Sequence, residues 1–181
     1  FGSLSSNGQV FLLNPNGVLF GQGAQVNVGG LVASTLNLSD ADFLAGRYTF
    51  AKVPGAGAVL NQGTITAASG GYVALIAPQV VNEGVINAQL GTVTLAAGEQ
   101  VTLNFSGRSL VSIAVDRGAL DALASNSQLI SADGGQVLLS AKSADTLARS
   151  VVNNAGIIQA NTINSSNGVI RLEGGIVTNS G

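Results

Sequence analysis

The stretch Val59–Gln79 reads VLNQGTITAASGGYVALIAPQ, and Val80–Gln100, which follows it, reads VVNEGVINAQLGTVTLAAGEQ. Asn61 aligns with Asn82, 21 residues later. Short apolar segments in both stretches alternate with Thr, Ser, Asn and Gln, a pattern typical of strands. A period near 20 residues is too short for a propeller blade or a helical repeat, and the LxxLxL signature of leucine-rich repeats is missing. The repeat therefore predicts an all-β chain: a single-stranded right-handed parallel β-helix in which each coil stacks on the next.

The same pattern extends in both directions from this repeat. Leu129–Ser140 matches the second half of a unit, Val151–Leu172 matches a whole unit with an insertion, and Gly8–Val28 has three short strand-like segments. At about 21 residues per coil, the chain has room for roughly eight coils. We expect one β-helix domain over residues 1–181.

Two segments break the period and predict excursions from the β-helix, near residues 35–50 and 102–126. In the first, Ser39 and Asp40 precede a Phe-Leu pair, which is typical of a short capped helix. In the second, TLNFSGRSLVSIAV predicts a hairpin turning at Ser106 and Gly107. The DRGALDALASN segment after it predicts a short amphipathic helix with Leu120 and Leu123 facing inward.

The composition excludes several function classes. Charged residues make up 9% of the chain, the net charge is −2, and the seven basic residues are scattered, so no basic surface for nucleic acid is expected. Cysteine and histidine are both absent, which excludes a thiol nucleophile, a Ser-His-Asp triad and a Cys/His zinc site. No apolar run approaches the roughly 18 residues of a membrane helix. The chain opens at Phe1 in mid-pattern, so we expect it to be a piece of a longer protein.

The most specific local motif is Asn14-Pro15-Asn16-Gly17. Proline fixes φ at the first central position of a turn, asparagine tolerates the conformation that follows, and glycine permits a sharp return to strand. Taken alone, the motif predicts a stable β-turn.

Asn61, Asn82 and Asn153 recur with the repeat, and Asn179 begins a further unit. Their recurrence predicts a stacked asparagine ladder at one corner of the coils, each amide bonding to the next. Carbohydrate or ion recognition is the alternative, but a single binding site would not require repetition at every coil.

Parallel β-helices also include polysaccharide lyases and hydrolases, whose catalysis depends on carboxylates placed together in a cleft. The close acidic pairs are Asp40 with Asp42 and Asp116 with Asp121, and both lie outside the repeat strands that would form a groove wall. We interpret them as solvated surface acids and expect no catalytic residue, no metal site and no cofactor.

The stretch Gly8–Ser39, GQVFLLNPNGVLFGQGAQVNVGGLVASTLNLS, resembles the centre of the two-partner secretion (TPS) domain of filamentous-haemagglutinin-type exoproteins of Gram-negative bacteria. The segments VVNEGVINA and ADGGQVLLSAKSAD are similar to the same domain, so the resemblance covers essentially the whole chain. It implies a right-handed β-helix with extra-helical elements. In this family, capping strands and an earlier NPN-type turn would lie before Phe1, and their absence here puts independent recognition in question.

The resemblance also implies a function. Such a domain is recognised in the periplasm by the POTRA domains of a TpsB-type outer-membrane transporter, and its folding at the cell surface starts export of the chain behind it. The residues that match the family motif are Asn14, Pro15, Asn16 and Gly17. The exported protein would be secreted or held at the surface of a Gram-negative bacterium. As an adhesin, a haemolysin or a contact-dependent toxin carrier, it would meet host or bacterial receptors through downstream regions.

Two alternatives stay open from the sequence. The flank of the β-helix could bind glycans directly, or the chain could be a polysaccharide lyase or hydrolase. Glycan-array binding and an ultraviolet assay for unsaturated products distinguish these from a targeting role.

Overall fold

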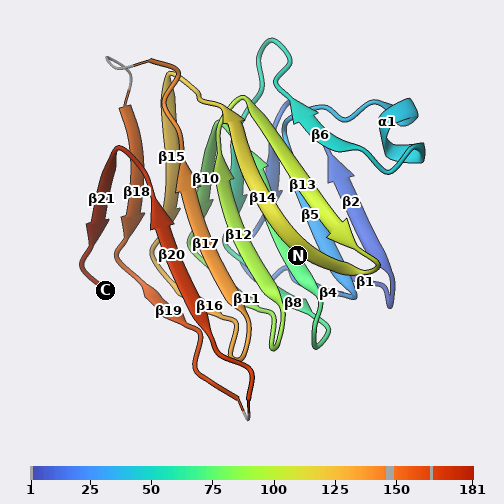
Figure 1. The fold of residues 1–181 in the computed structure, drawn as a ribbon, viewed down its shortest axis with the longest axis vertical. Coiled ribbons are helices and arrows are strands. Elements are labelled where there is room, and N and C mark those ends of the chain that lie inside the picture. The colour runs from blue at the N-terminus through green and yellow to red at the C-terminus, as the bar shows by residue number, and fades with distance from the viewer. Residues whose placement is uncertain (1, 146–148, 164) are drawn as a thin grey trace.

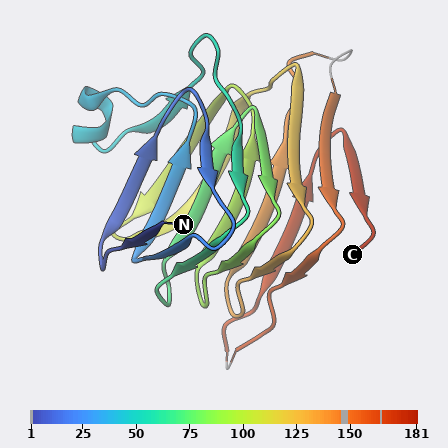
Figure 2. The same ribbon diagram turned by 180° about the vertical axis from the view of Figure 1, so that it is seen from behind.

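The computed structural model describes residues 2–145, 149–163 and 165–181, which wind into a right-handed parallel β-helix (Figure 1). Three parallel sheets of six strands each form its sides in this part of the chain. Every coil gives one strand to each sheet in the same order, so residues one coil apart lie side by side (Figure 2). The predicted fold class is confirmed.

The three sheets are named by the order in which a coil visits them. Sheet A contains β1 (Ser3–Ser5), β4 (Gln25–Val28), β8 (Thr64–Ala67), β11 (Val85–Asn87), β16 (Leu129–Ser131) and β19 (Ile157–Gln159). Sheet B contains β2 (Gln9–Leu13), β5 (Gly30–Ser34), β9 (Tyr72–Ala77), β12 (Thr92–Ala97), β17 (Gln136–Ala141) and β20 (Val169–Glu173). Sheet C contains β3 (Val18–Phe20), β7 (Val59–Asn61), β10 (Gln79–Asn82), β15 (Asp121–Asn126), β18 (Arg149–Asn154) and β21 (Ile176–Asn179).

The described residues form six coils, so the prediction of roughly eight was too high. The difference comes from two long insertions between a sheet B strand and the next sheet C strand. One follows β5 and the other follows β12. Their residues lengthen the chain without adding a coil.

The inner core consists of the inward-facing apolar side chains of sheets A, B and C. Its largest fully buried members are Leu31, Ile65, Leu75, Ile86, Leu95, Ile130 and Leu139. The register stacks like on like: Leu95 pairs with Leu75 on one side and with Leu139 on the other. Each coil therefore buries its apolar side chains against those of its neighbours. Burial of apolar surface is the main favourable term in folding.

Glycines mark the corner between sheets A and B because the coils meet there backbone to backbone. A Cβ on Gly91 would lie 2.2 Å from the carbonyl oxygen of Gly71, and a Cβ on Gly135 would lie 2.0 Å from that of Gly91. Since real Cβ atoms do not come so close to another atom, this corner requires glycine.

A second layer covers the outer face of sheet B. It is the antiparallel sheet D, with strand order β14 (Ser109–Arg117), β13 (Gln100–Ser106) and β6 (Tyr48–Ala51) (Figure 1). Between sheets B and D lies an outer core of buried side chains: Val32, Leu36, Leu38, Phe50, Tyr72, Ala74, Ile76, Ala96, Val101, Leu103 and Leu110. The middle strand β9 is consequently buried on both faces.

The two predicted excursions supply this layer. The hairpin forms as expected, with β13 and β14 paired antiparallel and Gly107 in the turn at φ +61°. The short helix α1 (Asp40–Leu44) also forms, and the Ser39 hydroxyl accepts a hydrogen bond from the Asp42 amide at 3.1 Å. No helix among the described residues is long and apolar enough to cross a membrane.

The second predicted helix, over the DRGALDALASN segment, is wrong. Its last six residues form β15, which pairs with β10 on one side and β18 on the other. Leu120 is 64% exposed and Leu123 is only half-buried, while Ala122 and Ala124 face the inner core. Pairing with two neighbouring strands outweighs the weak helical periodicity of the segment.

Candidate functional site

The NPNG motif forms the turn between β2 and β3 in the first coil. The Gly17 amide donates to the Asn14 carbonyl oxygen at 3.1 Å, which closes the turn. The Asn16 amide donates to the side-chain oxygen of Asn14, also at 3.1 Å. Gly17 has φ +130°, a conformation that other residues rarely adopt. The turn is thus held by the backbone and side-chain oxygens of Asn14 and by the conformation of Gly17.

Backbone hydrogen bonds attach this turn to the second coil. The Asn14 amide donates to the Ser34 carbonyl oxygen at 3.0 Å, and the Gly57 amide donates to the Pro15 carbonyl oxygen at 2.8 Å. A Cβ on Gly57 would lie 2.7 Å from the Asn16 carbonyl oxygen, so the two chains pack in direct contact. The backbone of the turn is fixed by these contacts.

The side chains of the turn remain available to a partner. Asn14 and Asn16 are both exposed. The Asn14 amide oxygen is used inside the turn, whereas the Asn16 side chain makes no hydrogen bond within the described part of the chain. The motif therefore presents an asparagine on a rigid corner of the first coil.

A ladder of asparagine side chains runs along the corner between sheets C and A. Asn61 donates to Asn82 at 2.7 Å, Asn82 to Asn126 at 2.7 Å, Asn126 to Asn154 at 2.8 Å, and Asn154 to Asn179 at 2.7 Å. The first four of these residues are buried. Their amides also bind the backbone of the corner, as in the bond from the Gly63 amide to the Asn61 side-chain oxygen at 3.1 Å. Buried amides are costly without partners, and the ladder gives each one a partner in the adjacent coil.

The structure corrects the predicted membership of this ladder. Asn153 pairs in register with Ser125 and lies outside the ladder, while Asn154 pairs with Asn126 and belongs to it. Asn126 was missed because its segment had been interpreted as a helix. A signal was present in the sequence, since each ladder residue of the first four precedes a core isoleucine by four positions: Ile65, Ile86, Ile130 and Ile158.

The acidic pairs do not converge on a common site. Asp42 binds the Ser39 hydroxyl and Arg47, and these two contacts lower the pKa of its carboxyl group. Asp116 accepts from the Thr102 hydroxyl at 2.6 Å, at the edge of the hairpin. Among the described residues, no group of three or more His, Cys, Asp or Glu side chains could hold a metal ion.

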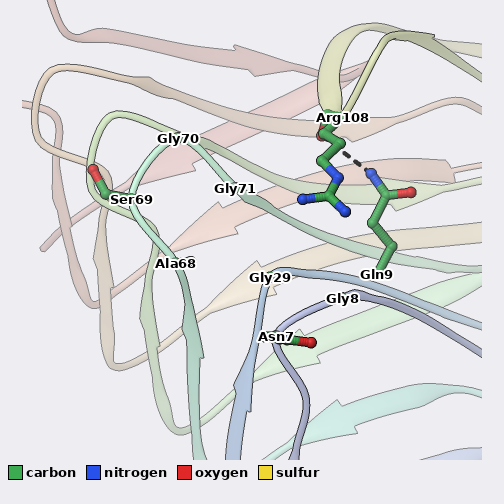
Figure 3. Close-up of a pocket in the computed structure, with 9 residues that line it drawn as sticks. All are labelled: Asn7, Gly8, Gln9, Gly29, Ala68, Ser69, Gly70, Gly71 and Arg108. Atoms are coloured by element: carbon green, nitrogen blue, oxygen red, sulfur yellow. Dashed lines mark hydrogen bonds between the residues drawn. The ribbon is translucent and has the colours of Figure 1, made fainter.

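A small pocket lies where the tip of the hairpin reaches the first coil (Figure 3). The Gln9 amide nitrogen donates to the Arg108 carbonyl oxygen at 3.2 Å, and the Arg108 side chain extends over the glycine corner at Gly29 and Gly71 (Figure 3). The lining is mostly backbone, and its only charged group is one guanidinium. The hydrogen bond between Gln9 and Arg108 joins the hairpin tip to the first coil beside this pocket.

Comparison with known proteins gives concordant matches. A family model described as the TPS secretion domain matches residues 1–181. A heme/hemopexin-binding protein of Haemophilus influenzae strain Rd is 34% identical over 180 residues, and the alignment covers 94% of this chain and 19% of that protein. A second heme/hemopexin-binding protein of Haemophilus influenzae is 32% identical over 195 residues, covering 94% of this chain and 20% of the relative. The chain thus spans about a fifth of the length of these curated relatives.

A solved structure agrees with the fold. The crystal structure of the HMW1 secretion domain from Haemophilus influenzae superimposes with a TM-score of 0.81 at 32% sequence identity. The match covers 94% of this chain and 44% of that one.

Proposed function

This chain belongs to the TPS secretion domain family, and on that premise we propose that it targets a longer exoprotein to a partner outer-membrane transporter, whose POTRA domains recognise it in the periplasm. Proteins with this domain are secreted exoproteins of Gram-negative bacteria. The domain is a targeting module, and the export route through the periplasm is part of the proposal.

One observation carries the proposal: the NPNG turn is rigid in its backbone and open in its side chains. Bonds to Ser34 and Gly57 fix the turn on the second coil, yet Asn14 and Asn16 face solvent. A recognition element gains affinity when it is held in its bound conformation before binding, because less freedom is lost on association. The Asn14 side chain closes the turn, whereas the exposed Asn16 side-chain amide has no partner in the described part of the chain and is therefore available to a partner protein.

Folding of the β-helix supplies a reason for directional export, which we propose uses no nucleotide. Each coil buries its inner-core side chains in part against the coils on either side, so each coil that emerges lowers the free energy of the segment outside. Return of the chain would require unfolding of that stack. The first coils to fold would therefore bias the direction of movement.

The direct test is binding of the chain to the purified POTRA domains of candidate transporters, measured by isothermal titration calorimetry. We expect Asn16→Ala to weaken binding at least tenfold, because it removes an exposed amide that supports nothing in the fold. Asn14→Ala should weaken it further, because the turn loses its internal hydrogen bond as well. Asn27→Ala, at an exposed asparagine on β4, is the matched control and should bind as the wild type does. Equal affinity of all four proteins would refute recognition through this turn.

The activity of the whole exoprotein is a separate proposal, namely adhesion through regions outside this domain. On a glycan array, the chain itself should then show no binding above background. Specific glycan binding by the chain that disappears on substitution of exposed residues of the β-helix flank would instead favour a directly adhesive domain.

A further inference from the structure

Sheet D ends at a strand with an open edge. Among the described residues, β14 pairs with β13 on one side and with no strand on the other, and at nine residues it is long for an edge strand. Sheet B continues beneath this edge with β17 and β20 (Figure 1). Edge strands in native proteins are normally short, covered or charged, because their free amides and carbonyls attract other strands.

A groove runs along the open edge. One part is lined by Leu110, Val111 and Ile113 of β14 together with Thr94 and Leu138 of sheet B. The adjoining part continues along Val115 to Ser140 and Lys142. Val111 is 59% exposed at the rim. The floor is therefore the stretch of sheet B that sheet D leaves uncovered.

A buried hydroxyl in this groove has no partner. Thr94 is fully buried, and its Oγ1 atom forms no hydrogen bond within the described part of the chain. The neighbouring Thr92 hydroxyl, by contrast, donates to the Leu110 carbonyl oxygen at 3.4 Å. Buried polar groups in native proteins are nearly always paired, so an orphan hydroxyl in a groove wall points to a polar group from outside.

The far end of the groove is lined by Lys142 and by Glu173, whose carboxylate is paired with Arg171. The Lys142 ammonium donates to the Val115 and Asp116 carbonyl oxygens at 3.1 and 2.9 Å. It makes no ion pair among the described residues, unlike Lys52, which lies 2.6 Å from Glu99. An acidic side chain placed at this end would meet an ammonium already fixed in position.

The uncovered floor determines what kind of partner fits. A second copy of this chain does not fit. If the β14 strands of two molecules paired antiparallel, the two β-helices would lie on the same side of the joined sheet, and the β-helix of the second molecule would overlap with β17 and β20 of the first. A single extended segment has no such backing. It can pair with the edge, set one row of side chains on the floor and leave the other in solvent.

We propose that the open edge of β14 binds one extended segment of a partner polypeptide, which adds a fourth strand to sheet D and places a carboxylate opposite Lys142. The segment turns every second residue toward the floor, where a hydroxyl side chain pairs with the Thr94 hydroxyl and the other floor-facing residues are small or apolar. Its remaining residues face solvent. This interaction is independent of the transporter recognition proposed above, which uses the NPNG turn of the first coil.

The test uses the 181-residue chain, labelled with nitrogen-15, and two synthetic nonapeptides that alternate valine with threonine. One peptide ends in glutamate and the other in lysine. We expect the glutamate peptide to shift the amide signals of residues 110–116 and to bind at least tenfold more tightly than the lysine peptide. Lys142→Glu should reverse this preference. Arg108→Glu, at the opposite end of the same hairpin, is the control and should leave it unchanged.

A second variant separates binding from folding. Thr94→Val removes the orphan hydroxyl at nearly constant shape, so it should raise the urea midpoint of the free chain and yet weaken the glutamate peptide severalfold. The proposal would be overturned if the relative affinities of the two peptides did not depend on the charge at position 142. It would also be overturned if the peptides shifted amide signals of residues outside β14 instead of those of β14. The absence of any binding by either peptide at millimolar concentration would overturn it as well.

Discussion

The inner stack and the outer layer of this domain are assembled from contacts at very different distances along the chain. In the inner stack, partners lie one coil apart, as with Asn61 and Asn82, which are 21 residues apart. In the outer layer, the Gln9 side chain bonds to the backbone of Arg108, 99 residues away, and the Phe105 ring lies 4.9 Å from that of Tyr48.

This difference has consequences for folding. Closing a longer loop costs more conformational entropy, so contacts between neighbouring coils can form before those of the outer layer. The outer face of the first three coils is only partly covered, by the β6 excursion, until the hairpin of the fourth coil has been added, because β13 and β14 follow β12 in the chain. We infer that the inner stack grows coil by coil and that sheet D closes over it later.

The largest expected effect comes from breaking the inner stack. Leu95 is fully buried between Leu75 and Leu139, so Leu95→Ala should lower the free energy of unfolding by about 2–5 kcal/mol. Urea denaturation followed by far-ultraviolet circular dichroism measures this. Leu19→Ala, at a leucine that is 64% exposed, is the control and should change the value by less than about 0.5 kcal/mol.

The asparagine ladder is the polar counterpart of the inner core and should be nearly as sensitive. Asn126→Ala leaves one side-chain N–H of Asn82 and the side-chain oxygen of Asn154 without partners, at about 1–3 kcal/mol for each unsatisfied group. Asn153→Ala is a sharp control, because this residue is adjacent in sequence and lies outside the ladder. Similar losses for both variants in urea denaturation would contradict the ladder register.

Loss of an aromatic contact in the outer layer should open sheet D locally and leave the inner stack folded. Phe105 contacts Phe11, Tyr48 and Tyr72, and each such ring pair contributes about 0.5–1.5 kcal/mol. In Phe105→Ala, amides of β13 and β14 should exchange with solvent faster, while those of β9 and β12 keep most of their protection. Uniform loss of protection in hydrogen exchange would show instead that the two layers unfold as one unit.

The smallest effect concerns Tyr72 in the outer core. Burial, with a smaller effect of nearby Tyr48, raises the pKa of its phenol, and its hydroxyl has no partner among the described residues. Because the folded-state pKa lies above the unfolded value of about 10, the resulting stability is complete below about pH 10 and is lost as the pH rises further.

Tyr72→Phe should therefore flatten the alkaline loss of stability and raise the neutral-pH value by up to about 1 kcal/mol. Urea midpoints at neutral pH and above about pH 10 measure both effects. If Tyr72→Phe lost as much stability at alkaline pH as the wild type does, the loss would arise from groups other than Tyr72.

The same contrast explains what the sequence could predict. The inner stack repeats, so the offset between Asn61 and Asn82 and the recurring apolar segments were enough to predict the β-helix. The capped helix at Ser39 and the turn at Gly107 were also predictable, because both depend on residues adjacent in sequence.

The errors arose where the period is interrupted. After the hairpin, the repeat resumes only at Asn126 and Ile130, and the leucines at 120 and 123 fit a helix as well as a strand until the pairing of Asp121–Asn126 with β10 and β18 is known. Two adjacent asparagines, Asn153 and Asn154, then left the ladder register ambiguous by one residue, and a shift of one residue exchanges the inward and outward faces. The site beside β14 has no sequence signature, because it is formed by the place where sheet D stops.

We propose that stacking of the inner core drives export of this domain. This proposal is tested most directly by the rate at which the domain reaches the surface of cells that carry the partner transporter, compared between wild type and a Val93→Asp, Leu95→Asp double variant. Both residues are fully buried in the inner core, and Leu19→Asp at an exposed position controls for the added charge. We expect the rate of surface appearance to fall strongly for the double variant and to stay unchanged for the control. An unchanged rate for the double variant would show that stacking of the inner core does not drive export.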